Sequence, residues 1–265
     1  MGNFKLRPRQ KLKKTTKVRV REANTLSLIK KVLSSKDELK TFTFNGNDKE
    51  LIDFGNTTLS FNDYNVIKLA PGAFVTSELQ QGVEQGQRIG NSINIKKVML
   101  NLIIVPKNYD SATNPSPEPL NVRVIILHSK QNPQEVIVAD TFFQDGNSTQ
   151  SPVSNLRDMM QDINKDMFVK SRDFRRKIGH AIANENGQVA VQQNYANNDY
   201  KFNSIDKLDI TKAFPRKMRW DDDIAVPISF NPYMVFLFSG ADGGTNAAST
   251  IPLEFTYQVT IHYTD

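Results

Sequence analysis

The chain has 265 residues, of which 38% are hydrophobic and 23% charged, and this balance is typical of a folded protein. It contains no cysteine, which excludes disulfides, thiolate metal sites and cysteine nucleophiles. The sequence lacks an apolar run of about 18 residues and an apolar stretch near its first residue, so we expect neither membrane insertion nor a signal peptide.

Positive charge is concentrated at the N-terminal end. The first 21 residues contain no acidic residue and nine basic ones: Lys5, Arg7, Arg9, Lys11, Lys13, Lys14, Lys17, Arg19 and Arg21. Residues 1–40 carry a net charge of +10, whereas residues 41–265 carry −4. Such a block repels itself and has little apolar surface to bury, so nucleic acid is its expected partner. A nuclear localisation signal is the alternative, and one segment can serve both purposes.

A short amphipathic helix is predicted in the second half of this basic arm. Leu26, Ile29 and Leu33 recur at helical spacing, with Leu28 and Val32 beside them. A membrane surface is one possible partner for the apolar stripe. Because the stripe is short, we favour packing against protein.

The body that follows the arm is predicted to be all-β. Segments rich in β-branched and aromatic residues alternate with turn-rich stretches, and no long helical period occurs. The last strand is the clearest, because apolar residues from Leu253 to Tyr263 alternate with polar ones. A change of phase at Lys96-Lys97 indicates a bulge or a strand covered on both faces. Other strands are predicted at residues 40–44, 65–69, 93–105, 121–129, 135–143, 167–178, 200–212 and 233–239.

Long polar connections separate these strands. Turn residues are dense in residues 107–119, 145–152, 185–199 and 240–250, which we expect to be surface loops. Strands of this number and spacing favour a single jelly-roll sandwich of eight strands, with a lipocalin-type barrel as the alternative. The predicted domains are therefore a basic arm over residues 1–40 and a jelly-roll domain over residues 41–265.

The sequence contains no recognisable catalytic or metal-binding motif. His128, His180 and His262 lie far apart without ligand-spaced partners, so we expect ordinary strand or loop residues. The sequence has neither a Gly-x-Ser-x-Gly nor a Walker-type motif. The acidic triplet at residues 221–223 favours a solvated turn over a cation site, because adjacent side chains on an extended chain point apart. We therefore predict no enzyme activity, no cofactor and no metal.

A second basic cluster lies within the acidic body. Residues 165–177 contain six basic and two acidic residues, a local charge of +4. On a strand, Arg172, Phe174, Arg176 and Ile178 share one face, which interleaves guanidinium groups with apolar side chains. This arrangement suits single-stranded nucleic acid, and the predicted contact residues are Arg172, Arg175, Arg176 and Lys177. A solvated or inter-subunit face is the alternative.

Two stretches resemble capsid proteins of circular Rep-encoding single-stranded DNA viruses. Residues 85–98, QGQRIGNSINIKKV, are similar to the loop and first core strand of that family. Residues 210–223, ITKAFPRKMRWDDD, are similar to its late strand and loop. The hydrophobic strand around residues 233–238 and a final strand ending in Tyr263-Thr264-Asp265 follow in the same order. The arm is shorter and less arginine-rich than in many members of the family.

The resemblance implies a capsid protein of which about 60 copies form an icosahedral shell around circular single-stranded DNA. The basic arm would bind the genome and engage the host nuclear import machinery, which places the protein in the virion and the host cell nucleus. An unknown host receptor is a further expected partner. The alternatives are a non-viral or accessory nucleic-acid-binding protein with a β-sandwich ligand-binding body, and a β-fold enzyme with paired carboxylates.

Overall fold

The computed structural model describes residues 25, 38–51, 65–72, 78–82, 86–107, 119–130, 137, 139–153, 155–180, 201–221, 227–240 and 252–265. The chain divides into two compact units, Met1–Leu39 and Lys40–Asp265. All nine predicted arm contacts and nearly all of the predicted helix lie outside the described residues. The fold below is that of the second unit.

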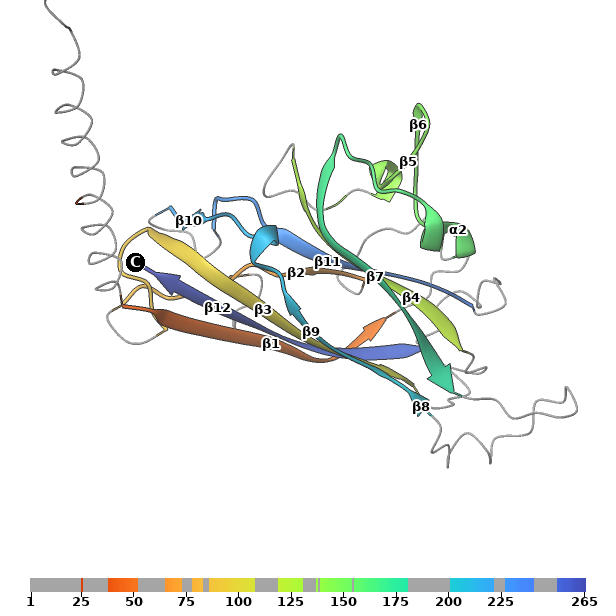
Figure 1. The fold of residues 1–265 in the computed structure, drawn as a ribbon, viewed down its shortest axis with the longest axis horizontal. Coiled ribbons are helices and arrows are strands. Elements are labelled where there is room, and N and C mark those ends of the chain that lie inside the picture. The colour runs from red at the N-terminus through yellow and green to blue at the C-terminus, as the bar shows by residue number, and fades with distance from the viewer. Residues whose placement is uncertain are drawn as a thin grey trace, which may run out of the picture. The chain divides into compact units, whose positions relative to one another are not determined.

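Two antiparallel sheets form the second unit (Figure 1). Sheet A runs in the order β1 (Lys40–Leu51), β12 (Leu253–Thr264) and β3 (Ser92–Pro106), and the other edge of β3 pairs with β9 (Ser204–Asp209) and β10 (Lys217–Arg219). Sheet B runs in the order β2 (Val66–Lys68), β11 (Pro232–Gly240), β4 (Leu120–Ser129), β7 (Phe168–His180) and β8 (Lys201–Phe202). The prediction of an all-β body is confirmed.

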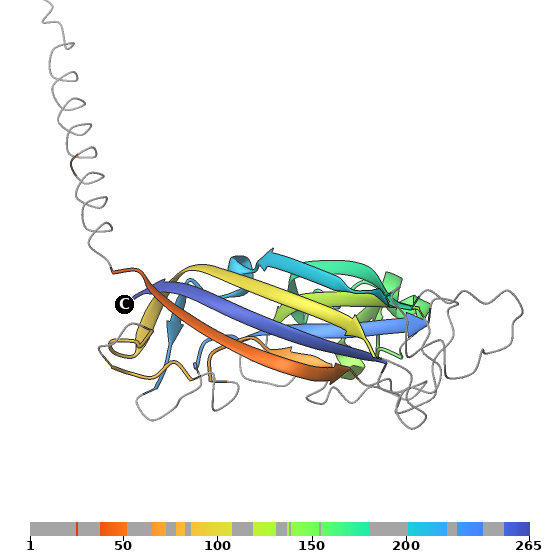
Figure 2. The same ribbon diagram turned by 90° about the horizontal axis from the view of Figure 1, so that it is seen from below.

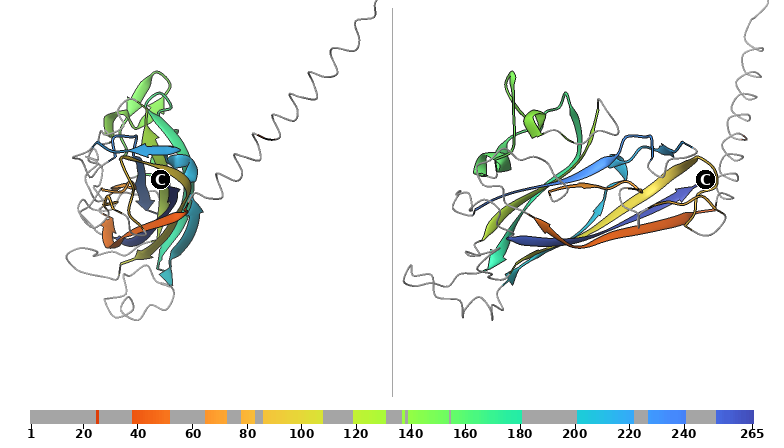
Figure 3. Two further views of the ribbon diagram at one scale, coloured as in Figure 1. Left: turned by 90° about the vertical axis from the view of Figure 1, so that its left-hand side faces the viewer. Right: turned by 180° about the vertical axis from the view of Figure 1, so that it is seen from behind.

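A covering segment, residues 139–153 and 155–167, packs on the outer face of sheet B. Its elements are the 3₁₀ turn η2 (Ala139–Thr141), the hairpin strands β5 (Phe143–Asp145) and β6 (Ser148–Gln150), and the helix α2 (Leu156–Met160). Figures 1 and 3 show them together on one side of the sandwich. The helix begins at Leu156 because the Asn155 side chain accepts hydrogen bonds from the first backbone N–H groups. A further 3₁₀ turn, η3 (Thr211–Ala213), connects β9 to β10.

The alternation of apolar residues explains the layers. Inward side chains of both sheets form one core, in which the rings of Phe236 and Phe255 lie 4.5 Å apart between centroids. Side chains on the other face of sheet B, such as Ile125 and Val235, form a second core with the covering segment. Because sheet B is covered on both faces, every residue of β11 is buried. In sheet A, β12 lies between β1 and β3 (Figure 2) and keeps an alternating pattern of burial.

The predicted strands are largely present, and the phase change at Lys96-Lys97 is a bulge. His262 pairs with Lys97, whereas the next residue, Tyr263, pairs with Ile95. This register leaves Lys96 as the extra residue of β3.

Two local predictions are wrong. The described part of residues 135–143 forms the turn η2 and not a strand before Phe143, because its apolar residues pack onto sheet B without pairing to it. Residues 145–152, predicted as a loop, include the strand β6, which pairs with β5 across a tight turn. Gly146 adopts a positive φ of 60° there, which suits a tight hairpin turn.

Candidate nucleic-acid interface

The four predicted contact residues of the body all lie on β7 and are exposed. Arg172 and Arg176 share the face of Phe174 and Ile178, which contributes to the core between the sheets. Arg175 and Lys177 project from the opposite face. The structure therefore divides this basic cluster between the two faces of sheet B.

Arg176 connects the two sheets. Its Nε donates to Asp206 Oδ2 at 3.3 Å, and its Nη2 forms an ion pair with Oδ1 of the same carboxylate on β9. The guanidinium carbon also lies 5.1 Å from the centroid of the Phe174 ring. Burial alone would raise the pKa of Asp206, but hydrogen bonds from Arg176 and Ser204 and the guanidinium charge hold the pKa below its ordinary value. Arg176 is thus an inter-sheet bridge as well as a partly exposed cation.

Arg172 lies in a cleft lined by residues of both sheets. Its Nε and Nη2 donate to the backbone carbonyl of Asp209 at 3.3 Å and 3.1 Å. The cleft has a volume of about 480 Å³, and we call it the cationic cleft; its lining residues are Lys96, Lys97, Ser171, Arg172, Asp209, Thr211 and Lys212. The three lysines are not among the predicted contacts, because they come from β3 and η3, far from β7 in the sequence. In the sequence, the change of phase at Lys96-Lys97 was the feature that indicated an irregularity at this position.

Thr211 donates hydrogen bonds to Asp209, the one carboxylate that lines the cationic cleft. Its backbone N and its Oγ1 donate to Asp209 Oδ1 at 3.0 Å and 2.6 Å. Its Oγ1 also accepts from the backbone N of Val98 at 2.9 Å, which fixes η3 to β3. These hydrogen bonds from Thr211, followed by the charges of Lys97 and Arg172, lower the pKa of Asp209. The lining therefore holds four cations against one carboxylate that stays ionised.

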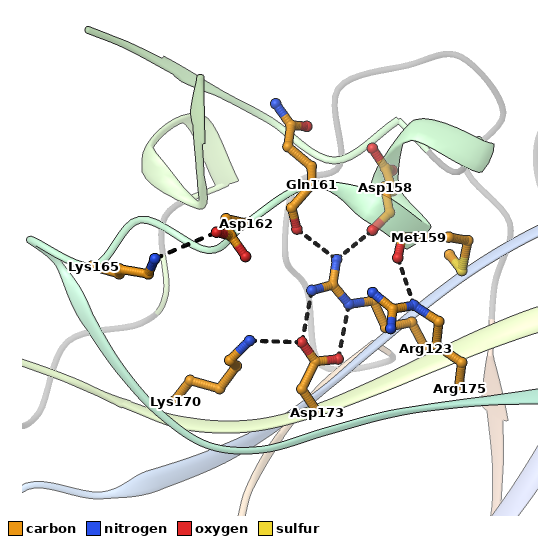
Figure 4. Close-up of polar contacts among 9 residues, drawn as sticks. All are labelled: Arg123, Asp158, Met159, Gln161, Asp162, Lys165, Lys170, Asp173 and Arg175. Carbon is orange, nitrogen blue, oxygen red and sulfur yellow. Dashed lines mark hydrogen bonds and ion pairs between the residues drawn. The ribbon is translucent and has the colours of Figure 1, made fainter. Parts of the chain in front are cut away.

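A buried arginine on the other face of sheet B holds the covering segment in place (Figure 4). The Arg123 side chain is 1% exposed. Its Nε and Nη2 donate to the two carboxylate oxygens of Asp173 at 3.0 Å and 2.8 Å. Its Nη1 donates to the carbonyls of Asp158 and Gln161 at 2.6 Å and 2.7 Å. One guanidinium thus ties β7 and the C-terminal half of α2 to β4.

Asp173 supplies the counter-charge at this buried site. Lys170 Nζ donates a further hydrogen bond to its carboxylate at 2.9 Å. Burial alone would raise the pKa of Asp173, but the hydrogen bonds and charges of Arg123 and Lys170 lower it to about 2. Arg175 also serves this region, because its Nε donates to the carbonyl of Met159 at 2.6 Å. Within the described residues, Lys177 forms no ion pair.

The histidines and the acidic triplet form no metal centre in the part of the chain that the structure describes. All three histidines lie on strands, as predicted. His128 stacks on Phe230 with 4.2 Å between ring centroids, and His262 Nδ1 lies 3.0 Å from Thr41 Oγ1. Asp221 is exposed, and the rest of the triplet lies outside the described residues.

No family model matches the sequence, and no curated protein matches it. In the described ranges, the helices are too short or too polar to cross a membrane. Strand order and charge distribution are therefore the observations that bear on function.

Proposed function

We propose that this chain is a viral capsid protein, whose jelly-roll domain assembles into an icosahedral shell and whose basic arm packages circular single-stranded DNA. The observation that carries the proposal is the order in which strands alternate between the sheets. Counted along the chain, the eight main strands are β1, β2, β3, β4, β7, β9, β11 and β12. They pair first with eighth, second with seventh, third with sixth and fourth with fifth.

This nested pairing supports a jelly roll, in which a long antiparallel hairpin is rolled into two sheets. The remaining strands fit the same plan. β10 pairs with β3 on the same side as β9, and β8 pairs with β7 at the edge of sheet B. The β5–β6 hairpin lies in the connection between β4 and β7. Jelly rolls of this kind are common in viral capsids, but lectins and cupins share the architecture, so fold alone does not decide the function.

The charge distribution supports a capsid over other jelly-roll proteins. The first 21 residues carry nine positive charges, whereas residues 41–265 carry a net charge of −4. Neutralisation of a DNA backbone by such an arm is strong and independent of base sequence, as packaging requires. The same arm serves nuclear import, and the assembled particle is the form that meets a host receptor.

Shell contacts between weakly acidic bodies must come from apolar and hydrogen-bonded surfaces. The described surface offers apolar side chains for such contacts. Phe202 is 57% exposed, Ile205 73% and Met160 82%. A subunit neighbour that covers these side chains would remove apolar area from water, which favours assembly.

Electron microscopy of the purified full-length chain tests the proposal. We expect closed shells that contain nucleic acid, and we expect a variant without residues 1–21 to form empty shells from a folded body. A chain that stays a monomer or dimer over all salt concentrations while binding nucleic acid contradicts the capsid assignment. That result would support an accessory nucleic-acid-binding protein.

A further inference from the structure

We propose that the cationic cleft binds backbone phosphates of single-stranded nucleic acid, beside the point where the chain enters the domain from the basic arm. This inference rests on the proposed function, because it gives the packaged strand a second, folded binding site. It adds Lys96, Lys97 and Lys212 to the contacts expected from the sequence.

The bulge in β3 places two adjacent lysines at the surface. In a regular strand, neighbouring side chains point to opposite faces, so one of Lys96 and Lys97 would point into the core. Here both are exposed, while Ile95 and Val98 on either side are buried. A bulge interrupts the ladder, and such irregularities occur frequently next to functional sites. The bulge therefore exposes two lysines of β3 where a regular strand would expose one.

The lysines of the cationic cleft exceed the carboxylates that line it. Among the described residues, Lys96, Lys97 and Lys212 form no ion pair with a carboxylate. The nearby Asp209 carboxylate accepts two hydrogen bonds from Thr211. An anion that enters the cleft thus meets cations without having to displace an ion-paired partner from the lysines.

The lining indicates phosphates rather than bases as the bound groups. Ammonium, guanidinium and hydroxyl groups are donors that suit phosphate oxygens. Sites that stack bases use aromatic side chains, and none of the seven lining residues is aromatic. A volume of about 480 Å³ is large enough for more than a single small ion.

The position of the cleft favours the strand that the arm binds. Thr41, His262 and Lys97 form one row across the outer face of sheet A, as their pairing shows. Neighbouring strands are about 4.8 Å apart, so Lys97 lies about 10 Å across the sheet from Thr41. Lys40, the first residue of this unit, is adjacent to Thr41. The residue at which the basic arm is covalently joined to this unit is thus within a short distance of Lys97.

The test uses the full-length chain with its arm intact and a short oligothymidylate as the probe. The cleft variant is Lys97→Gln with Lys212→Gln. The matched control is Lys207→Gln with Lys217→Gln, which removes two exposed positive charges that lie outside the cleft and form no ion pair among the described residues. The slope of log affinity against log salt is negative, and for single strands each lost phosphate contact makes it less steep by about 0.7. We expect the slope of the cleft variant to be less steep by about 1.4, and that of the control to stay the same.

A second readout separates nucleic acid from sulfated polysaccharide, which carries similar anions. We expect oligothymidylate to protect Lys96, Lys97 and Lys212 from acetylation in the wild-type chain. Equal slopes for the cleft variant and the wild type, or protection by a sulfated oligosaccharide alone, overturn the inference. If DNA-filled shells form while the cleft lysines remain unprotected, the inference fails and the proposed function stands. If the wild-type chain does not bind oligothymidylate, both fail.

Discussion

Two arginine sites on opposite faces of sheet B use the same side chain in opposite ways. Arg123 is buried, and one carboxylate and two carbonyls accept its hydrogen bonds. Arg172 is exposed in the cationic cleft, where three lysines accompany it. At the first site the carboxylate accepts hydrogen bonds from the buried guanidinium, whereas at the second site four cations share one carboxylate. The comparison shows how burial decides the role of a cation, because a buried charge requires a partner whereas an exposed one remains available to a ligand.

The largest effect is expected from Arg123→Leu. Among the described residues, the substitution leaves the Asp173 carboxylate with Lys170 as its one ion-pair partner, and it removes the donor for two carbonyls of the covering segment. We expect the free energy of unfolding to fall by about 3–5 kcal/mol, as when one partner of a buried ion pair is lost. Urea denaturation at neutral pH measures this loss. The double variant with Asp173→Leu serves as the control and should recover part of it, and a loss below about 1 kcal/mol would show that Arg123 does not hold the segment.

The second largest effect is expected in acid, where protonation of Asp173 destabilises the fold. The pKa of Asp173 is lowered from 3.8 to about 2 in the folded chain, so its ionised form is favoured by folding. Its contribution, at most about 2 kcal/mol, is present above pH 4 and is lost as the pH falls towards 2. Urea midpoints measured over that range for the wild type and Asp173→Asn should converge in acid. Midpoints that stay a constant interval apart at all pH values would contradict the assignment.

The layers of the fold could be predicted because a half-buried strand carries its pattern locally. The alternation from Leu253 to Tyr263 identifies one wet and one buried face, which is what β12 shows. The covering segment could not be predicted in the same way. Phe142 and Met159 reach sheet B without pairing to any strand of it, so no period in the sequence marks them as core residues.

The two faces of β7 show the same limit at the candidate site. That Arg172 and Arg176 share a face with Phe174 followed from the period of a strand. Their partners Asp209 and Asp206 lie on β9, in the other sheet, and only the fold brings them together. Local sequence therefore predicted which side chains project together, whereas it could not predict which charges are neutralised.

An intermediate effect is expected from Arg176→Ala, since this arginine combines features of both sites. Its side chain is 42% exposed, but its partner Asp206 is only 8% exposed. We expect a loss of about 1–2 kcal/mol in unfolding free energy, because Asp206 remains buried and Ser204 is its one remaining side-chain donor among the described residues. Lys177→Ala, a neighbour without an ion pair among the described residues, is the control and should change stability by less than about 0.5 kcal/mol. Equal losses for both variants would show that the contact between Arg176 and Asp206 does not stabilise the fold.

The smallest effect on stability is expected in the cationic cleft itself. Lys97→Ala with Lys212→Ala removes two exposed charges that repel each other and Arg172, and this gain offsets the lost attraction between Lys97 and the Asp209 carboxylate. We expect the unfolding free energy to change by less than about 0.5 kcal/mol at physiological salt, and to rise slightly at low salt where the repulsion is less screened. Urea titrations at two salt concentrations measure both. A loss above about 1 kcal/mol would mean that these lysines support the fold as Arg123 does, and the contrast between matched and surplus charge would not hold.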